Sequence, residues 1–436
     1  MNAVTAGRLE VLRPRKSGLV QAVGDLILAH LDLIFRVLRF VWPITVSLPN
    51  LGVVVTRNDD VREVLLNNGD FHVEQAERMG LLMDNTPFML GLDDRDAFVH
   101  SRAPLEKAVR REDGALLTQW CGERAAELVA EARGRIEVVD YIRQIALDVF
   151  SRYTGVTQPT DHHDLRIMTT RFYEYQVTPE GGDSELKKEA ERQAKALRDY
   201  IDGLIADAKH SGPKDDTVLG RLLIYQADHP GALSCAEIRS NLIGLLIGAL
   251  PQLPIGAPQT VDQLLSRPRE LAAAAESARF GDDATLQRYL LEASRFAPLA
   301  PLLMRRCVRN HEIASGAWRH TTIKKGQIVT AALLSAMKDP RRVADPEMFD
   351  PDRGEATYLH FGFGLHTCFF AQINPLLLTA MLKPLLACEG LARERGRRGR
   401  LLMRGIFTDQ LWLRFTPPAR TEPSPQPSSV KQLAPA

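Results

Sequence analysis

The most constraining segment of this chain is the loop at residues 361–368, which reads Phe-Gly-Phe-Gly-Leu-His-Thr-Cys. It places Cys368 directly before an apolar run that predicts a helix. Gly362 and Gly364 can adopt positive φ without steric strain, so the backbone N–H groups of the loop can turn toward one sulfur atom. A thiolate held in this way is a ligand for a haem iron. The pattern therefore predicts that Cys368 ligates haem, the alternative being a cysteine that is merely buried.

This loop resembles the signature of the cytochrome P450 family, Phe-Gly-x-Gly-x-His/Arg-x-Cys-x-Gly. Every position matches from Phe361 to Cys368. The final glycine does not match, because Phe370 stands in its place, and we expect the loop to enter its helix differently. The resemblance implies that the cofactor is haem b (iron protoporphyrin IX), that Cys368 is the iron ligand, and that Phe361 and Gly362 belong to the haem-binding loop.

A second match lies upstream of the cysteine. Glu292 and Arg295 are three residues apart, which places both on one face of a helix where they can pair. Such a pair alone is usually a solvated surface feature. In the family, however, this Glu-x-x-Arg pairs with an arginine from a Phe-x-Pro-x-Arg loop, present here at residues 349–353. The resemblance thus implies a structural role for Glu292, Arg295 and Arg353.

Haem carries two propionates, which need cations or hydrogen-bond donors. The resemblance implies that His366 and Arg305 supply them, with Arg306 as the adjacent alternative. His100 matches the histidine of the family's Asp-x-x-x-His-x-x-x-Arg helix, although Pro104 occupies the arginine position. For each of these side chains taken alone, solvation at the surface is the commoner outcome.

The sequence departs most from the family in residues 237–254, where a long helix normally crosses the haem. The family places an acid followed by a threonine there, and these two residues deliver protons during oxygen activation. Counting back from Arg267 puts Pro251 at the acid and Gln252 at the alcohol, within one residue. These are the candidate catalytic positions, with Gln252 and ordered water as a possible substitute relay. Pro251 lacks an N–H and Pro254 repeats the effect, so we expect a kinked helix.

Composition is that of one large globular domain. The chain has 436 residues, of which 45% are hydrophobic and 25% charged, and no interior low-complexity linker divides it. Residues 44–56 and 323–330 each read as a β-hairpin, and most of the remaining pattern is helical. The resemblance covers roughly residues 44–415 and implies a single domain with the cytochrome P450 fold, mainly α with a small β-rich lobe.

The two ends lie outside this domain. Residues 1–43 form the predicted N-terminal amphipathic helix region, because the apolar stretch 24–42 carries one stripe of charged side chains. These are Asp25, Asp32, Arg36 and Arg39. Charges at such positions disfavour a transmembrane helix, so we expect a helix packed on the domain, the alternative being peripheral contact with a membrane surface. Residues 416–436 are rich in Pro and Ser and are predicted to be a disordered tail.

Charge and cysteine content limit location and partners. The net charge of +1 gives no reason to expect nucleic acid binding. The five cysteines show no Cys-x-x-Cys pair or disulfide framework, which fits a reducing cytoplasm. No flavin or nicotinamide fingerprint is present, so electrons would come from a separate ferredoxin or reductase. Lys107, Arg110 and Arg111 form a basic group where family members dock such a partner.

Three functions are compatible with these residues. The first, which we take as the prediction, is a monooxygenase that inserts one oxygen atom from dioxygen into an apolar small molecule. The second is a peroxide-dependent or hydroperoxide-rearranging enzyme of the same family, favoured by the missing acid and alcohol. The third is a non-catalytic haem-binding protein. The apolar loop at residues 79–92 falls where the family covers its substrate, or it simply packs under the surface.

Overall fold

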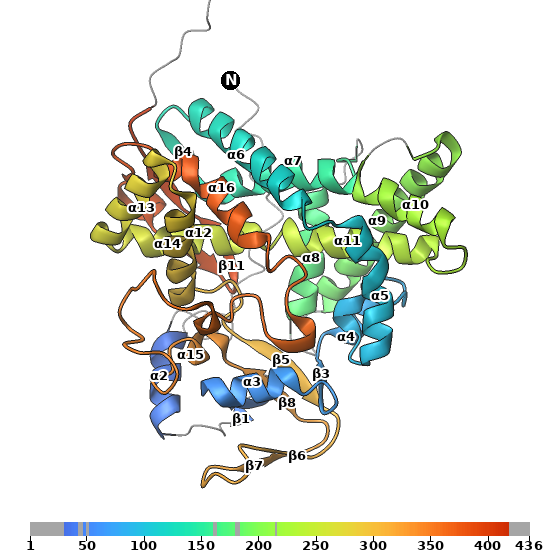
Figure 1. Cartoon of the computed structure of the whole chain (residues 1–436), viewed down its shortest axis with the longest axis horizontal. Helices are drawn as coiled ribbons and strands as arrows, with labels where there is room; N and C mark the ends of the chain where they lie inside the picture. The colour runs from blue at the N-terminus through green and yellow to red at the C-terminus, as the bar shows by residue number, and fades with distance from the viewer. Residues whose placement is uncertain are drawn as a thin grey trace, which may run out of the picture.

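The computed structural model describes residues 30–41, 47–48, 52–159, 164–178, 184–213 and 216–417. The predicted disordered tail therefore lies outside the described residues except for 416 and 417, as does most of the N-terminal region. The fold is mainly α with a small β-rich lobe, as predicted (Figure 1). Figure 1 shows the main sheet with α2, α3 and α15 at one end of the molecule and the long helices filling the rest.

The helices alternate with short connections over most of the chain. They are α2 (Leu31–Val41), α3 (Asn58–Leu66), α4 (Ala76–Leu82), α5 (Arg95–Ala108), α6 (Asp113–Glu131), α7 (Val138–Thr154), α8 (Leu165–Val177), α9 (Ser184–Ser211), α10 (Val218–Asp228), α11 (Cys235–Ala249), α12 (Leu253–Leu265), α13 (Pro268–Phe280), α14 (Asp283–Phe296), α15 (Leu333–Ala336) and α16 (Asn374–Leu386). Short 3-10 turns occur at η3 (Met89–Gly91), η4 (Glu355–Thr357), η5 (Gly364–His366) and η6 (Gly396–Gly399).

The strands form one five-stranded sheet and three smaller ones. They are β1 (Ser47–Leu48), β2 (Gly52–Val55), β3 (Phe71–Val73), β4 (Arg135–Glu137), β5 (Leu303–Cys307), β6 (His311–Ile313), β7 (Thr321–Ile323), β8 (Ile328–Ala331), β9 (Ala392–Arg393), β10 (Leu402–Arg404), β11 (Phe407–Gln410) and β12 (Trp412–Arg414). The main sheet has the order β1-β2-β8-β5-β3, with only β2 and β8 parallel.

The first predicted hairpin is present and the second is wrong. Strands β1 and β2 pair antiparallel, with Ser47 opposite Val53. Strands also form at both ends of residues 323–330, but they do not pair with each other. Strand β7 pairs with β6, and β8 lies between β2 and β5. Since both edges of β8 are occupied, β7 has no free edge there to join.

Helix α3 has no cap from its own segment. Asn58 is its first helical residue, and Arg57 at the N-cap makes no side-chain capping bond. The cap comes from far along the chain instead, because Asp339 Oδ2 accepts the Asn58 N–H at 3.0 Å. This contact ties the small lobe to the segment that leads to the cysteine loop.

Helix α2 packs on the small lobe through one face. Leu31 and Phe35 are buried against Val54, Ala332 and Leu334. Leu33 and Val37 on the opposite side are exposed. Asp32 also accepts a hydrogen bond from Lys338 Nζ at 2.8 Å, so part of the predicted charged stripe binds the domain.

The core is one large helical cluster and a smaller cluster under the main sheet. The stretch Cys235–Leu265 is long and apolar enough to cross a membrane by composition, yet 72% of its 18-residue apolar window is buried inside the protein. Burial on all sides is the property of a core helix.

Candidate functional site

The cysteine loop has the glycine turns that the sequence predicts. Gly362 and Gly364 have φ of 77° and 78°. The loop closes on itself where the Cys368 N–H donates to the Phe361 carbonyl at 2.7 Å. A side chain at Gly364 would also collide with the lobe below, because an added Cβ would lie 2.6 Å from the Leu65 carbonyl oxygen. Gly364 thus allows the loop to pass close over α3.

Gly364→Ala is expected to lower the free energy of unfolding by more than about 2 kcal/mol. The left-handed conformation alone costs a non-glycine residue about 1–2 kcal/mol, and the contact with Leu65 adds to it. Gly316→Ala is the matched control, since Gly316 has φ of 79° and open space around the added Cβ. Urea unfolding of both variants measures the difference, and equal losses would show that the close approach to Leu65 contributes nothing.

The Cys368 sulfur lies deep in the protein beside two N–H donors. Burial raises the pKa of its thiol, while the Phe370 backbone N–H and the Asn374 side chain act in the opposite direction. Asn374 Nδ2 lies 3.5 Å from the sulfur. The residue nevertheless keeps some exposed surface, as do its neighbours along the loop. The Cys368 side chain is therefore deep in the fold but not fully enclosed by protein atoms.

Two buried basic side chains lie near the Asp93 carboxylate beside this loop. Arg305 is 3% exposed, and burial lowers its pKa to about 10, opposed by the charge of Asp93. His366 Nε2 lies 3.1 Å from Asp93 Oδ1. Arg305 Nε and His366 Nδ1 are both buried without a hydrogen-bond partner among the described residues. Buried polar atoms without a partner are rare in native proteins, and the unpaired Arg305 N–H points to an acceptor that binds there.

The other two propionate candidates lie elsewhere. Arg306 follows Arg305 on β5 and faces Glu74, whose carboxylate is 3.9 Å away. Successive strand residues point to opposite faces, so Arg305 and Arg306 cannot serve one group together. His100 lies on α5 and is exposed. Among the described residues, His366 therefore pairs with Asp93 and Arg305 feels the charge of the same carboxylate, whereas no contact joins His100 to them.

Helix α11 has one exposed residue, close to its C-terminal end. Gly248 is exposed although its neighbours Ile247 and Ala249 are buried. An added Cβ at Gly248 would meet nothing within 4 Å. One turn earlier, the same face is covered, because a Cβ at Gly244 would lie 2.2 Å from Phe88. The Phe88 ring therefore covers α11 one turn before the open position at Gly248.

The helix is interrupted where the two prolines stand. Helix α11 ends at Ala249 and α12 begins at Leu253, with a turn between them. Gln252 Nε2 points back along the chain toward the Ile247 carbonyl at 3.4 Å. Pro251 is buried and lines a cavity of about 10 Å³ beside the break. A proline and a glutamine offer neither a carboxylate nor a hydroxyl at these two positions.

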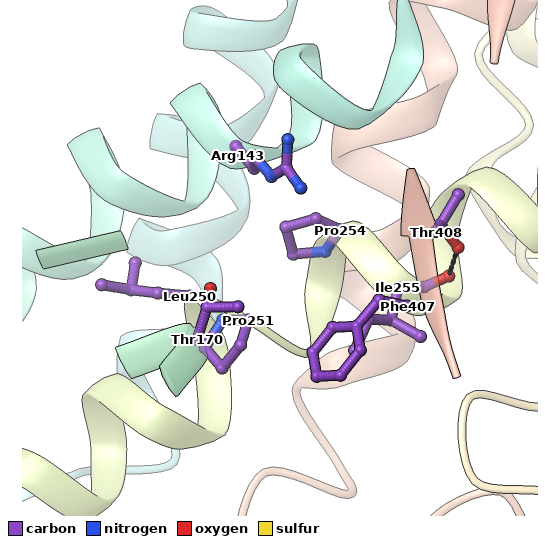
Figure 2. A pocket seen from close by; sticks show the side chains of 8 residues that line it. All are labelled: Arg143, Thr170, Leu250, Pro251, Pro254, Ile255, Phe407 and Thr408. Atoms are coloured by element: carbon purple, nitrogen blue, oxygen red, sulfur yellow. Dashed lines mark hydrogen bonds between the residues drawn. The ribbon is translucent and has the colours of Figure 1, made fainter. Parts of the chain in front are cut away.

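Figure 2 shows this cavity between the break and strand β11. Its lining residues are Arg143, Thr170, Leu250, Pro251, Pro254, Ile255, Phe407 and Thr408. Its volume is at the lower limit for one water molecule. The Thr408 hydroxyl on β11 donates to the Ile255 carbonyl at 2.9 Å, which anchors the start of α12. The cavity is therefore a packing defect of the helix break and too small for a substrate.

Glu292, Arg295 and Arg353 form one buried network. Arg295 donates to both carboxylate oxygens of Glu292, at 2.6 and 2.9 Å, and Arg353 Nε lies 3.2 Å from Glu292 Oε1. Glu292 and Arg295 are both 0% exposed. Arg295 also donates to the carbonyls of residues 337, 346 and 348. The network thus ties α14 to the segment that precedes the cysteine loop.

Comparison with known proteins places these features in one family. The cytochrome P450 sequence model matches residues 284–382, which hold the Glu292 network and the cysteine loop. Nocardicin C N-oxygenase from Nocardia uniformis subsp. tsuyamanensis is 26% identical over 73% of this chain and 77% of its own length. This chain belongs to the cytochrome P450 family.

Two further comparisons define the extent of the likeness. The solved structure of P450BioI, in complex with hexadec-9Z-enoic acid ligated acyl carrier protein, has the same fold. Its TM-score is 0.77 at 19% identity, and the match covers 90% of this P450 and 100% of that chain. Psi-producing oxygenase A from Emericella nidulans is 34% identical over 27% of this P450, which spans only 11% of that relative's length.

Membership of the P450 family establishes the cofactor class. P450 proteins are haem-thiolate oxidoreductases that bind haem b through a cysteine, as the sequence predicts. The described residues fit this cofactor, because a deep thiol, two buried basic side chains with unpaired nitrogen atoms and an open position on α11 are all present. An oxidoreductase is thereby favoured over a haem-binding protein without activity.

Two residues of this P450 were missed by sequence reasoning. Asn374 lies beside the sulfur, and Asp93 lies near both Arg305 and His366. The sequence held a signal for Asn374, because an Asn directly before a proline is typical of a helix start, and this helix start follows Cys368 closely. Asp93 reaches the site through tertiary contacts that no local pattern predicts. Phe88, which covers α11, belongs to the segment 79–92 that we expected over the substrate.

Proposed function

We propose that this P450 is a monooxygenase that inserts one oxygen atom into an apolar small molecule. The observation that carries the proposal is the open position at Gly248, which lies on a helix of Leu, Ile and Ala side chains, one turn after the residue that the Phe88 ring covers. Positions four residues apart share a helix face, so a molecule at Gly248 would lie on the face that carries this ring. An apolar wall favours a lipid, terpenoid or aromatic substrate over a charged one.

Each side chain that matches a family motif has a role in this proposal. Haem b supplies the redox and oxygen chemistry when it is bound. Cys368 would ligate its iron, Arg305 and His366 would hold its propionates, and Phe361 and Gly362 would shape the loop beneath it. His100 remains a propionate candidate from α5. Glu292, Arg295 and Arg353 would hold the loop segment in place without contacting the cofactor.

A separate protein would supply the electrons. Lys107, Arg110 and Arg111 lie exposed at and after the end of α5. Positive charge on this surface would steer an acidic ferredoxin, and the association rate would fall as salt increases. All five cysteines are free, which supports a reducing cytoplasm as the location.

A hydroperoxide-rearranging or peroxide-dependent P450 is the second candidate, and one observation favours it. Counting along the sequence assigns Pro251 and Gln252 to the family's acid and alcohol positions, α11 and α12 are interrupted there, and the Gln252 amide points back to the Ile247 carbonyl. Without a carboxylate or hydroxyl at these two positions, delivery of protons is expected to be slow. A substrate that brings its own O–O bond needs less of that delivery.

A reaction without reductant separates the two candidates. The purified haem-loaded ferric protein is mixed with a polyunsaturated fatty-acid hydroperoxide, and the loss of conjugated-diene absorbance is followed. If the protein is a monooxygenase, the conjugated-diene absorbance is lost slowly. Product then forms from apolar substrates only when reductant and a ferredoxin are added. Rapid loss in wild type that is absent in Cys368→Ser would instead support the hydroperoxide reaction.

A further inference from the structure

The side chain of Asn374 is aimed at the sulfur of Cys368. Its Nδ2 atom lies 3.5 Å from the sulfur. The backbone at this point is held, because the Asn374 N–H donates to the Phe370 carbonyl at 2.8 Å and Pro375 follows in the first turn of α16. Thr379, one turn further on, closes its own bond to the Pro375 carbonyl at 2.8 Å. The main chain of Asn374 is thus held in place, and only its side-chain amide can change direction.

The path of the loop explains why a side chain reaches the sulfur. Helix α16 does not begin at the cysteine but at Asn374, after two consecutive turns. In these turns the Ala371 N–H donates to the Cys368 carbonyl at 3.0 Å, and the Ile373 N–H donates to the Phe370 carbonyl at 2.9 Å. Phe370 is held against Phe150 with ring centroids 6.1 Å apart. The chain therefore curls around the sulfur and returns an amide to it.

The sulfur consequently has two N–H donors of different origin. The Phe370 donor belongs to the backbone and is kept in every substitution except proline, whereas the Asn374 donor belongs to a side chain and can be removed. A hydrogen bond to a thiolate withdraws electron density from the sulfur, and such bonds tune the reduction potential of the metal that the sulfur ligates.

We propose that Asn374 is a positioning residue that adjusts the electron donation of the Cys368 thiolate toward haem iron. Its amide N–H stabilises negative charge on the sulfur, weakens the iron–sulfur bond and raises the reduction potential. The inference rests on ligation of haem by Cys368 and is independent of whether dioxygen or a hydroperoxide is the oxidant.

Two variants of nearly equal size test the proposal in the haem-loaded full chain. Asn374→Leu removes the donor, and Asn374→Asp replaces it with an acceptor while keeping a residue that suits a helix start. Thr379→Val is the control on the same helix, because it removes a buried hydroxyl that does not contact the sulfur. The readouts are the reduction potential by spectroelectrochemical titration and the iron–sulfur stretching frequency by resonance Raman spectroscopy.

The expected result is a lower potential and a higher iron–sulfur frequency in Asn374→Leu, with a larger fall in potential in Asn374→Asp and no shift in Thr379→Val. Should Asn374→Leu fail to retain haem, Asn374→Asp decides by the same readouts. Unchanged potential and frequency in the variant that retains haem would overturn the proposal. A wild-type spectrum without thiolate features would instead refute Cys368 ligation, so the two failures are distinguishable.

Discussion

Cys368→Ser is expected to abolish thiolate ligation and to reduce turnover at least 100-fold. A serine hydroxyl is far less acidic than a thiol and gives the iron no comparable electron donation. Loss of a residue that only hydrogen-bonds to a metal ligand already lowers metal affinity or activity about 10–100-fold, and loss of the ligand itself exceeds that. Haem content and product formation are measured together, so that loss of cofactor is separated from loss of chemistry.

Cys388→Ser is the matched control for this substitution. Cys388 follows the end of α16, is partly exposed, and lies near the Pro384 carbonyl rather than near the loop. It is expected to keep wild-type turnover and haem content. Wild-type turnover in Cys368→Ser would contradict the assignment of the ligand.

Arg295→Leu is expected to lower the free energy of unfolding by about 3–5 kcal/mol. Arg295 and Glu292 are both fully buried, and removal of one partner of a buried ion pair leaves an uncompensated charge. The backbone carbonyls of residues 337 and 346 would also lose the Arg295 donor, whereas the carbonyl of residue 348 keeps a bond from Arg353. The retained Arg353 contact to Glu292 compensates only in part, since Arg353 also donates to the carbonyls of residues 344, 345 and 348.

Denaturant unfolding of two further variants completes this test. Arg288→Leu on the same helix breaks an ion pair with Asp352 that is at least half exposed, and is expected to cost less than about 1 kcal/mol. The double variant Glu292→Met with Arg295→Leu removes both charges and is expected to recover part of the loss. Equal effects of Arg295→Leu and Arg288→Leu would contradict the structural role of the buried network.

Most of the correct predictions came from the spacing of residues that are close together in the sequence. The glycine turns around Gly362 and Gly364 and the pairing of Glu292 with Arg295 depend on residues a few positions apart, and the structure shows both. The interruption near Pro251 was also expected, since proline removes a donor wherever it stands. The mainly α fold with a small β-rich lobe followed from the resemblance and is confirmed.

The features that the sequence did not predict depend on residues that are distant in the chain. Strand β8 pairs with β2 and β5 rather than with β7, because the edge it occupies is decided by the whole sheet. The cap of α3 comes from Asp339, far beyond any local pattern. Asp93 reaches Arg305 and His366 by the same kind of long-range contact. His100 shows the converse, a residue that matches a motif but makes no contact with the other candidates in the described structure.

The most direct test of the central claim is the absorption spectrum of the reduced, carbon monoxide-bound wild-type protein, recorded beside Cys368→Ser. Ligation of haem by the Cys368 thiolate predicts the long-wavelength Soret maximum typical of this family in wild type and its loss in the variant. A wild-type spectrum without that maximum, in protein that retains haem, would contradict the account. The same maximum persisting in Cys368→Ser would move the ligand to another residue.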